Sequence, residues 1–388
     1  MQLVSPMPVS DLFERVRALY PDRPLRTLWR SAGYKLRPPR PVAFVPQIDS
    51  RVRARLAEGC DRPEQVAELL CELRPGPIPT VVLGGFVPDA TEAVYILRGM
   101  FLRHGSVYYF NYPHDGFSAP LLFAQLEDLL EELSVRYGTP PIVMGISFGC
   151  GLLLEWLRRA RRRDRPARLR GIVLVSPVTC TADVLERGID KPGTMLGRAL
   201  APFLAASGGA PEEAQVDRSR KLLLRMFEAG VQGRNAARVL LTRGELLLLR
   251  HRVMRTVGAI TARGATERIR AFAAMEPPTG WFTLATAPLC EAPVLVLFAE
   301  KESSVLSKSA PSARLQEVAG ELFPSAQVRV VSARVGGPVQ HASLVFHAFH
   351  FSPPLSRFYR RLRKHVALEQ GGLAVRWGRA GMRRMGVV

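Results

Sequence analysis

The stretch from Pro141 to Glu155, Pro-Ile-Val-Met-Gly-Ile-Ser-Phe-Gly-Cys-Gly-Leu-Leu-Leu-Glu, constrains the fold of this chain more than any other. The apolar run at 142–145 predicts a buried strand, and the apolar residues after the serine predict a helix. Ser147 therefore lies at a corner between a strand and a helix. Gly145 and Gly149 flank this corner, and residues without a Cβ allow the backbone to turn back tightly.

Short apolar runs alternate with helical stretches on both sides of this corner. Runs such as 80–84 and 171–177 are almost continuously apolar, which is typical of strands buried on both faces of a parallel sheet. Helical stretches at about 91–104 and 118–137 separate the first strands, so right-handed crossovers are expected. The sequence predicts an α/β fold with a mostly parallel central sheet and helices on both faces. The expected strands are 80–84, 106–111, 142–145, 171–177, 293–298 and 327–331.

Residues 1–78 are basic and interrupted by prolines, and they show no clear pair of strands. We expect a short helix at Asp11–Leu19, a strand at 41–45 and a helix at 63–73. This part is interpreted as a basic extension that packs on the core. The expected apolar face of the last helix consists of Val66, Leu69, Leu70 and Leu73.

Residues 178–290 lack strand signals. Amphipathic stretches at 211–230 and 236–261 instead predict an all-helical insertion between two strands of the sheet. The core would then consist of residues 79–177 and 291–366.

An amphipathic helix is expected after Pro353 and Pro354, followed by a basic tail at 367–388. Two interpretations stay open for this end of the chain: a packed terminal helix with a frayed tail, or an anchor on a membrane surface. The apolar face of the helix would consist of Leu355, Phe358, Tyr359, Leu362 and Val366.

The chain carries 54 Lys and Arg against 34 Asp and Glu, a formal charge of +20. Such a charge attracts anionic lipid or nucleic acid at long range. Arginine far outnumbers lysine among these basic residues. That excess is also typical of a GC-rich genome, so basicity alone does not identify a partner. No zinc finger, aromatic ribonucleoprotein motif or helix-turn-helix spacing is present, and a specific nucleic-acid partner is not expected. Nothing indicates the oligomeric state.

The five cysteines are scattered, odd in number and form no C-x-x-C pair, which argues against a disulfide framework or a zinc site. The start of the chain carries Asp11 and Glu14 and does not have the pattern of a secretory signal. No window of 18 uninterrupted apolar residues is present. We therefore expect a cytoplasmic protein, peripheral at a membrane at most.

The pattern G-x-S-x-G at a strand-to-helix corner resembles the nucleophile elbow of the α/β-hydrolase superfamily. The resemblance covers about 79–177 and 291–350, and it depends on the order and spacing of strands. It implies that the helical insertion at 178–290 is a cap over an active site.

The resemblance implies a catalytic triad in the order serine, acid, histidine. A serine hydroxyl needs an imidazole to remove its proton, and a carboxylate fixes the imidazole tautomer. Ser147 takes the place of the nucleophile. His341 is favoured as the base among seven histidines, because it follows the last strand and the loop at 336–338.

The acid is expected a few residues after a later strand. Glu302 falls at that place, with Glu300 close by, although aspartate is the commoner residue there in the family. Asp183, which follows the preceding strand, is a further alternative.

An oxyanion hole requires two backbone N–H groups that point at the developing negative charge. The resemblance places them at Phe148, directly after the serine, and at Phe86, after Gly84 and Gly85. The family often has His-Gly at this last place, but a backbone donor does not depend on that histidine.

The implied activity is that of a serine hydrolase, which cleaves an ester or thioester through an acyl-enzyme and needs no cofactor or metal. The leucines at 246–249 point weakly to an apolar acyl group. An acyltransferase with the same triad stays open, as does a catalytically inactive member that serves as a binding or membrane-surface protein.

Overall fold

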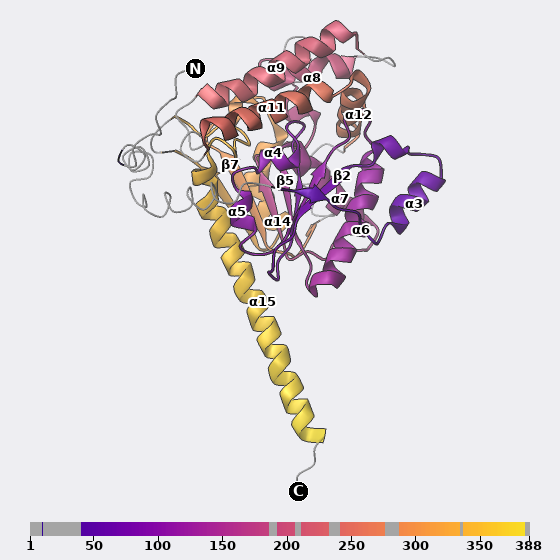
Figure 1. Ribbon diagram of the computed structural model, residues 1–388, viewed down its shortest axis with the longest axis vertical. Coiled ribbons are helices and arrows are strands. Elements are labelled where there is room, and N and C mark those ends of the chain that lie inside the picture. Colours follow the sequence, from indigo (N-terminus) through magenta and orange to yellow (C-terminus); the bar gives the residue numbers. More distant parts are fainter. Residues whose placement is uncertain are drawn as a thin grey trace.

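The computed structural model describes residues 10, 40–185, 192–205, 211–232, 241–275, 287–333 and 337–384, without the side chains of 205, 229–232 and 370–384. At its centre lies an eight-stranded sheet with helices packed around it (Figure 1). The strand order is β1-β2-β4-β3-β5-β6-β7-β8. The α/β fold expected from the sequence is confirmed.

The parallel part of the sheet runs from β4 through β3, β5, β6 and β7 to β8. Every residue of β3, β4, β5, β6 and β7 is buried, because helices cover both faces of these strands. Their carboxyl ends therefore meet at one edge of the sheet. These strands are β3 (Thr80–Leu83), β4 (Val107–Asn111), β5 (Ile142–Ile146), β6 (Gly171–Val175), β7 (Val294–Ala299) and β8 (Ala326–Val331).

Two antiparallel strands precede this part, β1 (Val42–Ala43) and β2 (Glu68–Glu72). The helix predicted at 63–73 is wrong, because only a short 3-10 turn at Pro63–Gln65 comes before β2. Leu69 and Cys71, two residues apart, face the core, whereas Leu73 is 60% exposed. Pairing with β4 over the whole length of β2 outweighs the helical spacing of these leucines.

The strand expected at 41–45 is present as β1, whereas β2 lies where the sequence predicted a helix. The helix predicted at Asp11–Leu19 lies outside the described residues.

Two long helices flank the central strands, α6 (Ala119–Tyr137) and α7 (Phe148–Arg162), as the sequence predicts. Ser118 begins α6, and its Oγ accepts a hydrogen bond from the Leu121 N–H at 3.3 Å. Gly138 ends this helix with a φ of 62°.

The helix expected at 91–104 is two short helices, α4 (Ala90–Ala93) and α5 (Arg98–Phe101). A capping box formed by Asp89 and Glu92 begins α4. Two further helices pack on the core: α3 (Ser50–Ala57) beside α6, and α14 (Leu315–Leu322) beside β8.

Four α-helices of the described residues lie between β6 and β7, and we call them the inserted helices. They form a layer above the sheet in the view of Figure 1. No strand occurs among the described residues between β6 and β7, although parts of that region are outside the description. The inserted helices are α8 (Met195–Ala205), α9 (Glu213–Gln232), α11 (Arg243–Ala259) and α12 (Ala262–Ala273).

The last helix, α15 (Ala348–Arg384), begins five residues before Pro353 and contains both prolines, where the sequence predicted a helix after them. Both prolines lie beyond the first turn, and each lacks the N–H that would donate to the carbonyl four residues earlier in the helix. Its expected apolar face is buried, and the Tyr359 hydroxyl lies 2.9 Å from Thr80 Oγ1 of β3. Beyond the body of the protein the helix continues outward (Figure 1).

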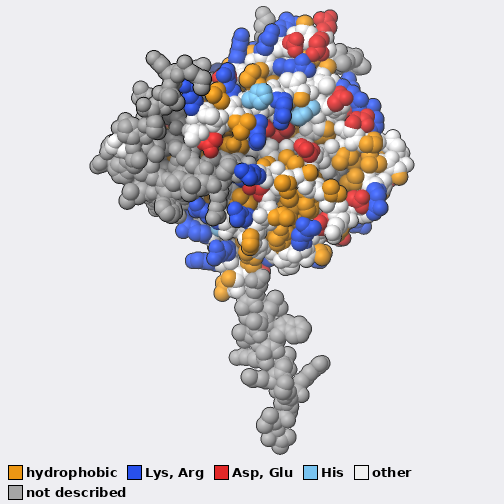
Figure 2. Space-filling model, viewed as in Figure 1, with side chains coloured by type: hydrophobic (Ala, Val, Ile, Leu, Met, Phe, Trp, Pro, Cys, Tyr) orange, Lys and Arg blue, Asp and Glu red, His pale blue; other side chains and the backbone are white. Residues whose placement is uncertain are grey.

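On the face shown in Figure 2, Lys and Arg side chains are scattered among acidic and apolar ones and do not gather in one patch. None of the helices in the described part of the chain is both long and apolar enough to cross a membrane.

Candidate active site

Ser147 stands alone between β5 and α7, at the carboxyl edge of the sheet. Its φ of 51° and ψ of −114° are unusual for a residue with a side chain. The Ser147 N–H donates to the Val175 carbonyl of β6 at 2.9 Å, which holds the corner in place. A Cβ at position 149 would overlap the carbonyl oxygen of Gly84, and one at position 145 would lie 2.8 Å from that of Gly149. Both glycines are therefore required for this turn.

His341 reaches Ser147 from the loop that follows β8. Its Nε2 lies 2.9 Å from Ser147 Oγ, across 194 residues of sequence. The loop is joined to the one after β7, because the Lys301 N–H donates to the Val339 carbonyl at 2.9 Å. The His341 side chain is only 6% exposed, so a proton can pass between these atoms with little competition from water.

Glu302 lies on the other side of the imidazole, in a 3-10 turn directly after β7. One carboxylate oxygen contacts His341 Nδ1, and the other accepts a hydrogen bond from the Ala299 N–H at 2.6 Å. Burial by itself would raise the pKa of Glu302, but the charge of His341 and the hydrogen bonds around the carboxylate bring this pKa below its ordinary value. The carboxylate is therefore ionised at neutral pH.

Ser176, which the sequence analysis did not single out, joins these groups. It follows β6 with a φ of 45° and is fully buried. Its Oγ accepts a hydrogen bond from the Ala342 N–H at 2.9 Å, and its side chain also bonds to Glu302. A serine at the end of a buried strand is a weak signal, since nothing local shows which loop it will meet.

The two alternative acids have other partners. Asp183 is fully buried and accepts hydrogen bonds from the Thr179 N–H at 2.5 Å and the Ser312 N–H at 2.7 Å. Glu300 accepts from the Ala333 N–H at 3.2 Å. The structure thus brings Glu302 to His341, whereas Asp183 and Glu300 hold surrounding loops.

Phe148 follows Ser147 directly in the chain, and Phe86 belongs to the loop that passes beside it. Phe148 is the first residue of α7, where backbone N–H groups have no partner within the helix. The loop of Gly85 and Phe86 runs beside the corner, since a Cβ on Gly85 would lie 3.7 Å from that of Ser147. The two phenylalanine rings meet edge to face at 5.9 Å. Both expected oxyanion-hole residues are therefore beside the nucleophile.

Two nearby histidines serve the fold. Burial lowers the pKa of His347 to about 4, and its Nδ1 lies 2.8 Å from Ser343 Oγ. Its ring packs against His350 with centroids 5.8 Å apart. Among the described residues, no three His, Cys, Asp or Glu side chains are arranged to hold a metal.

Comparison with solved structures identifies the fold. An esterase from Thermogutta terrifontis superposes with a TM-score of 0.52 at 13% identity, over 84% of this chain and all of that one. A membrane phospholipase A, described as a bacterial virulence factor, matches with a TM-score of 0.52 at 14% identity, over 90% of this chain and 93% of that one. A Rhodococcus esterase matches with a TM-score of 0.50 at 16% identity, over 76% and 96% of the two chains.

The chain has the α/β-hydrolase fold. No protein-family model matches its sequence, and no curated protein is significantly similar to it. At the identities found, the likeness to the esterases and the phospholipase is one of fold.

Proposed function

We propose that this protein is a serine hydrolase that cleaves a carboxylic ester or thioester through an acyl-enzyme. The observation that carries the proposal is the continuous contact from Glu302 through His341 to Ser147, with Nε2 and Oγ 2.9 Å apart. These three side chains come from three separate loops at the carboxyl edge of the sheet. This is the edge where α/β sheets place their active sites.

In this mechanism His341 Nε2 takes the hydroxyl proton as Ser147 Oγ forms a bond to the substrate carbonyl carbon. The carbonyl oxygen becomes negative and accepts hydrogen bonds from the backbone N–H groups of Phe86 and Phe148. When the intermediate collapses, the bond to the alcohol or thiol breaks, and His341 returns the proton to that leaving group.

Water then releases the acyl group. His341 removes a proton from the water, whose oxygen attacks the Ser147 ester. In the second collapse the bond from the acyl carbon to Ser147 Oγ breaks, His341 returns the proton to that oxygen, and a carboxylic acid is freed. Glu302 stays ionised in both halves and stabilises the imidazolium.

The preference for an apolar acyl chain has less support than the chemistry. The run 246–249 does not form one surface, because Leu249 is buried while Leu247 and Leu248 are 52% and 46% exposed. Aromatic side chains near the serine are the better candidates for acyl contacts: Phe272 of α12 packs against Phe148, with ring centroids 5.4 Å apart.

The proposal is tested with p-nitrophenyl esters of increasing acyl length. We expect turnover by the wild type and a decrease of about 10⁴-fold or more in kcat for Ser147→Ala. Ser325→Ala, which changes an exposed serine before β8, is the matched control and should keep full activity. Equal rates in Ser147→Ala and the wild type would exclude the mechanism.

The same assay separates hydrolysis from acyl transfer. Addition of an alcohol or amine acceptor, with product analysis, should give mainly the free acid. A product that is mostly acylated acceptor would instead identify an acyltransferase.

A further inference from the structure

The inserted helix α12 is fastened to the core at its N-terminal end. Thr261 begins the helix, and its N–H donates to the His114 carbonyl at 3.0 Å. Gly264 lies so close to that carbonyl that a Cβ at this position would overlap its oxygen. No larger residue fits between α12 and the loop after β4.

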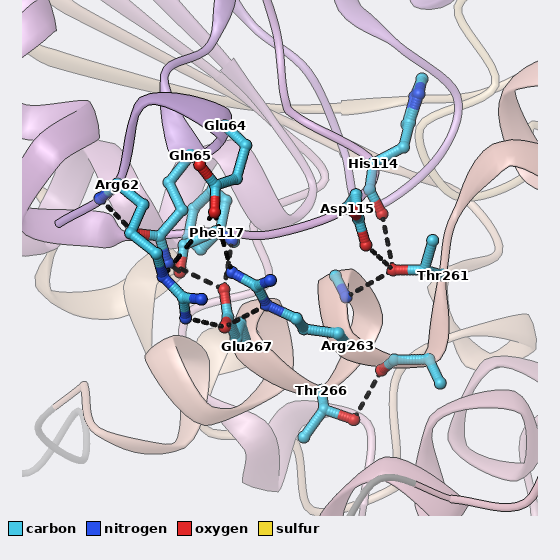
Figure 3. A network of polar contacts seen from close by, with 12 residues as sticks. Arg62, Glu64, Gln65, His114, Asp115, Phe117, Thr261, Arg263, Thr266 and Glu267 are labelled. Carbon is cyan, nitrogen blue, oxygen red and sulfur yellow. Dashed lines mark hydrogen bonds and ion pairs between the residues drawn. The ribbon is translucent and has the colours of Figure 1, made fainter.

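One turn further along, Glu267 continues this contact. It accepts hydrogen bonds from the Phe117 N–H at 2.7 Å and from Gln65 Nε2 at 2.9 Å, and Arg263 holds it at 3.1 Å. Figure 3 shows Glu267 between Arg62, Gln65 and Phe117 on one side and Arg263 on the other. This set of contacts fixes α12 to the core.

Arg268, the next residue, is the largest fully buried side chain of the described residues and is 1% exposed. Its Nη1 donates to the Phe86 carbonyl at 2.8 Å. Its Nη2 donates to the carbonyls of Tyr112 at 3.1 Å and Pro113 at 2.9 Å. One guanidinium thus joins the loop after β3 to the loop after β4.

No ion pair neutralises Arg268 within the described part of the chain, and its Nε is buried without a hydrogen-bond partner. The guanidinium lies over the rings of Phe86 and Tyr112, 5.7 and 5.6 Å from their centroids. Burial lowers the pKa of Arg268 to about 10, which leaves it charged at neutral pH. The charge of Asp89 acts on the guanidinium from beyond ion-pair distance and opposes this lowering. A buried charge held by carbonyl dipoles and rings, without a direct ion pair, is costly, and apolar packing alone would not need it.

We infer that Arg268 is a positioning residue for the oxyanion hole: its hydrogen bond to the Phe86 carbonyl holds the Phe86 backbone so that its N–H faces the oxygen that develops at Ser147. The inference rests on the proposed hydrolase function. It assigns a role in transition-state binding to a residue of the inserted helices. The family resemblance did not point to this residue.

The position of the bond favours this role over a purely structural one. Phe86 carries both the carbonyl that Arg268 binds and the N–H that the oxyanion needs, so a rotation of this residue would move both. The preceding Gly84 and Gly85 offer no side chain that could hold the loop. Since the oxyanion forms in the transition state and the tetrahedral intermediate but is absent from the bound substrate, loss of this orientation should lower kcat and leave KM unchanged.

The test compares Arg268→Met and Arg268→Lys with Glu267→Gln as the matched control. Glu267 fastens the same helix to the core without touching Phe86. All rates are divided by the concentration of serine titrated with a fluorophosphonate, which removes the contribution of misfolded protein. The second readout is the inhibition constant of a trifluoromethyl ketone, whose hemiketal oxyanion occupies the hole.

We expect Arg268→Met to lower kcat by about 10- to 100-fold at constant KM, below the loss of a direct oxyanion donor. The ketone should bind weaker by the same factor. Arg268→Lys, which keeps a charge but not the fork of donors, should have a kcat and a ketone affinity between those of the wild type and Arg268→Met. Glu267→Gln should lose thermal stability but keep kcat within about twofold.

Two results would overturn the inference. In the first, the wild type hydrolyses esters, but both Arg268 variants keep a kcat and a ketone affinity within about twofold of the wild-type values. The proposed hydrolase function would then hold without the role of Arg268. In the second, the wild type contains no titratable serine, and the proposed function fails together with the inference.

Discussion

At the scale of single residues, the account depends on Glu302 being the group that orients His341. The sequence left three carboxylates open, since all follow strands of the parallel sheet. The contact with His341 Nδ1 favours Glu302. The carboxylate oxygens of Asp183 instead accept hydrogen bonds from the N–H groups of Thr179 and Ser312. Glutamate in place of aspartate is accommodated by the 3-10 turn that begins at Glu302 itself.

We predict that Glu302→Gln lowers kcat by about 10³- to 10⁴-fold with little change in KM, because an amide cannot stabilise the imidazolium and permits the wrong tautomer. Glu300→Gln should keep kcat within about fivefold. Asp183→Asn should mainly lower the midpoint of thermal unfolding. Steady-state kinetics on the three variants decides between them, and a larger loss of kcat in Asp183→Asn than in Glu302→Gln would contradict the assignment.

Two residues beside the candidate site could not be predicted from the sequence, and both for the same reason. Ser176 and Arg268 act through contacts with residues far away in the chain, and neither lies in a pattern that marks its role. Ser147 and His341 were identified because their order relative to the strands carries information. A residue that supports another side chain leaves no such trace in a single sequence.

At the scale of elements, Glu92 joins α4 of the core to α11 of the inserted helices. Its carboxylate accepts hydrogen bonds from the Asp89 N–H at 3.0 Å and from Thr256 Oγ1 at 3.3 Å. Burial, together with the charge of Asp89, raises the pKa of Glu92 to about 7. The folded protein therefore holds a proton on Glu92 at pH values where the unfolded chain has lost it.

This gives a pH dependence with a definite sign. The stability that Glu92 contributes is fully present below about pH 4.5 and is lost as the pH rises through 7, at up to about 1.4 kcal/mol per pH unit. Glu92→Gln does not titrate, so it should become more stable relative to the wild type as the pH rises over this range. Urea unfolding at pH 5, 6, 7 and 8 measures the difference.

Glu321→Gln, at an exposed position of α14, is the control and should run parallel to the wild type. If the curves for Glu92→Gln and the wild type were also parallel, Glu92 would be ionised in the folded protein throughout this range.

Elements also show where sequence patterns fail. The strands of the parallel sheet were predictable because they are buried on both faces and so are continuously apolar. β2 (Glu68–Glu72) was not predictable, because only one of its faces is buried. The spacing of its leucines fits a helix as well as a strand. Only its pairing with β4 decides between the two.

At the scale of the whole molecule, the sheet brings together loops that are far apart in sequence. The helical face of α15 packs against the body as expected for a terminal helix, from Leu355 to Val366. Whether the basic charge of the chain brings it to an anionic membrane stays a prediction, and so do its location in the cell and the role of the inserted helices as a cap.

The central claim is that one serine is activated by one distant histidine. Its most direct measurement is the rate of covalent labelling by a fluorophosphonate, with the modified residue mapped by tandem mass spectrometry. His365→Ala, which changes an exposed histidine of α15, serves as the control for His341→Ala. The account predicts one adduct, at Ser147, formed at least about 100-fold more slowly in His341→Ala and at the wild-type rate in His365→Ala. An adduct at another residue, or equal labelling rates in the wild type and His341→Ala, would contradict it.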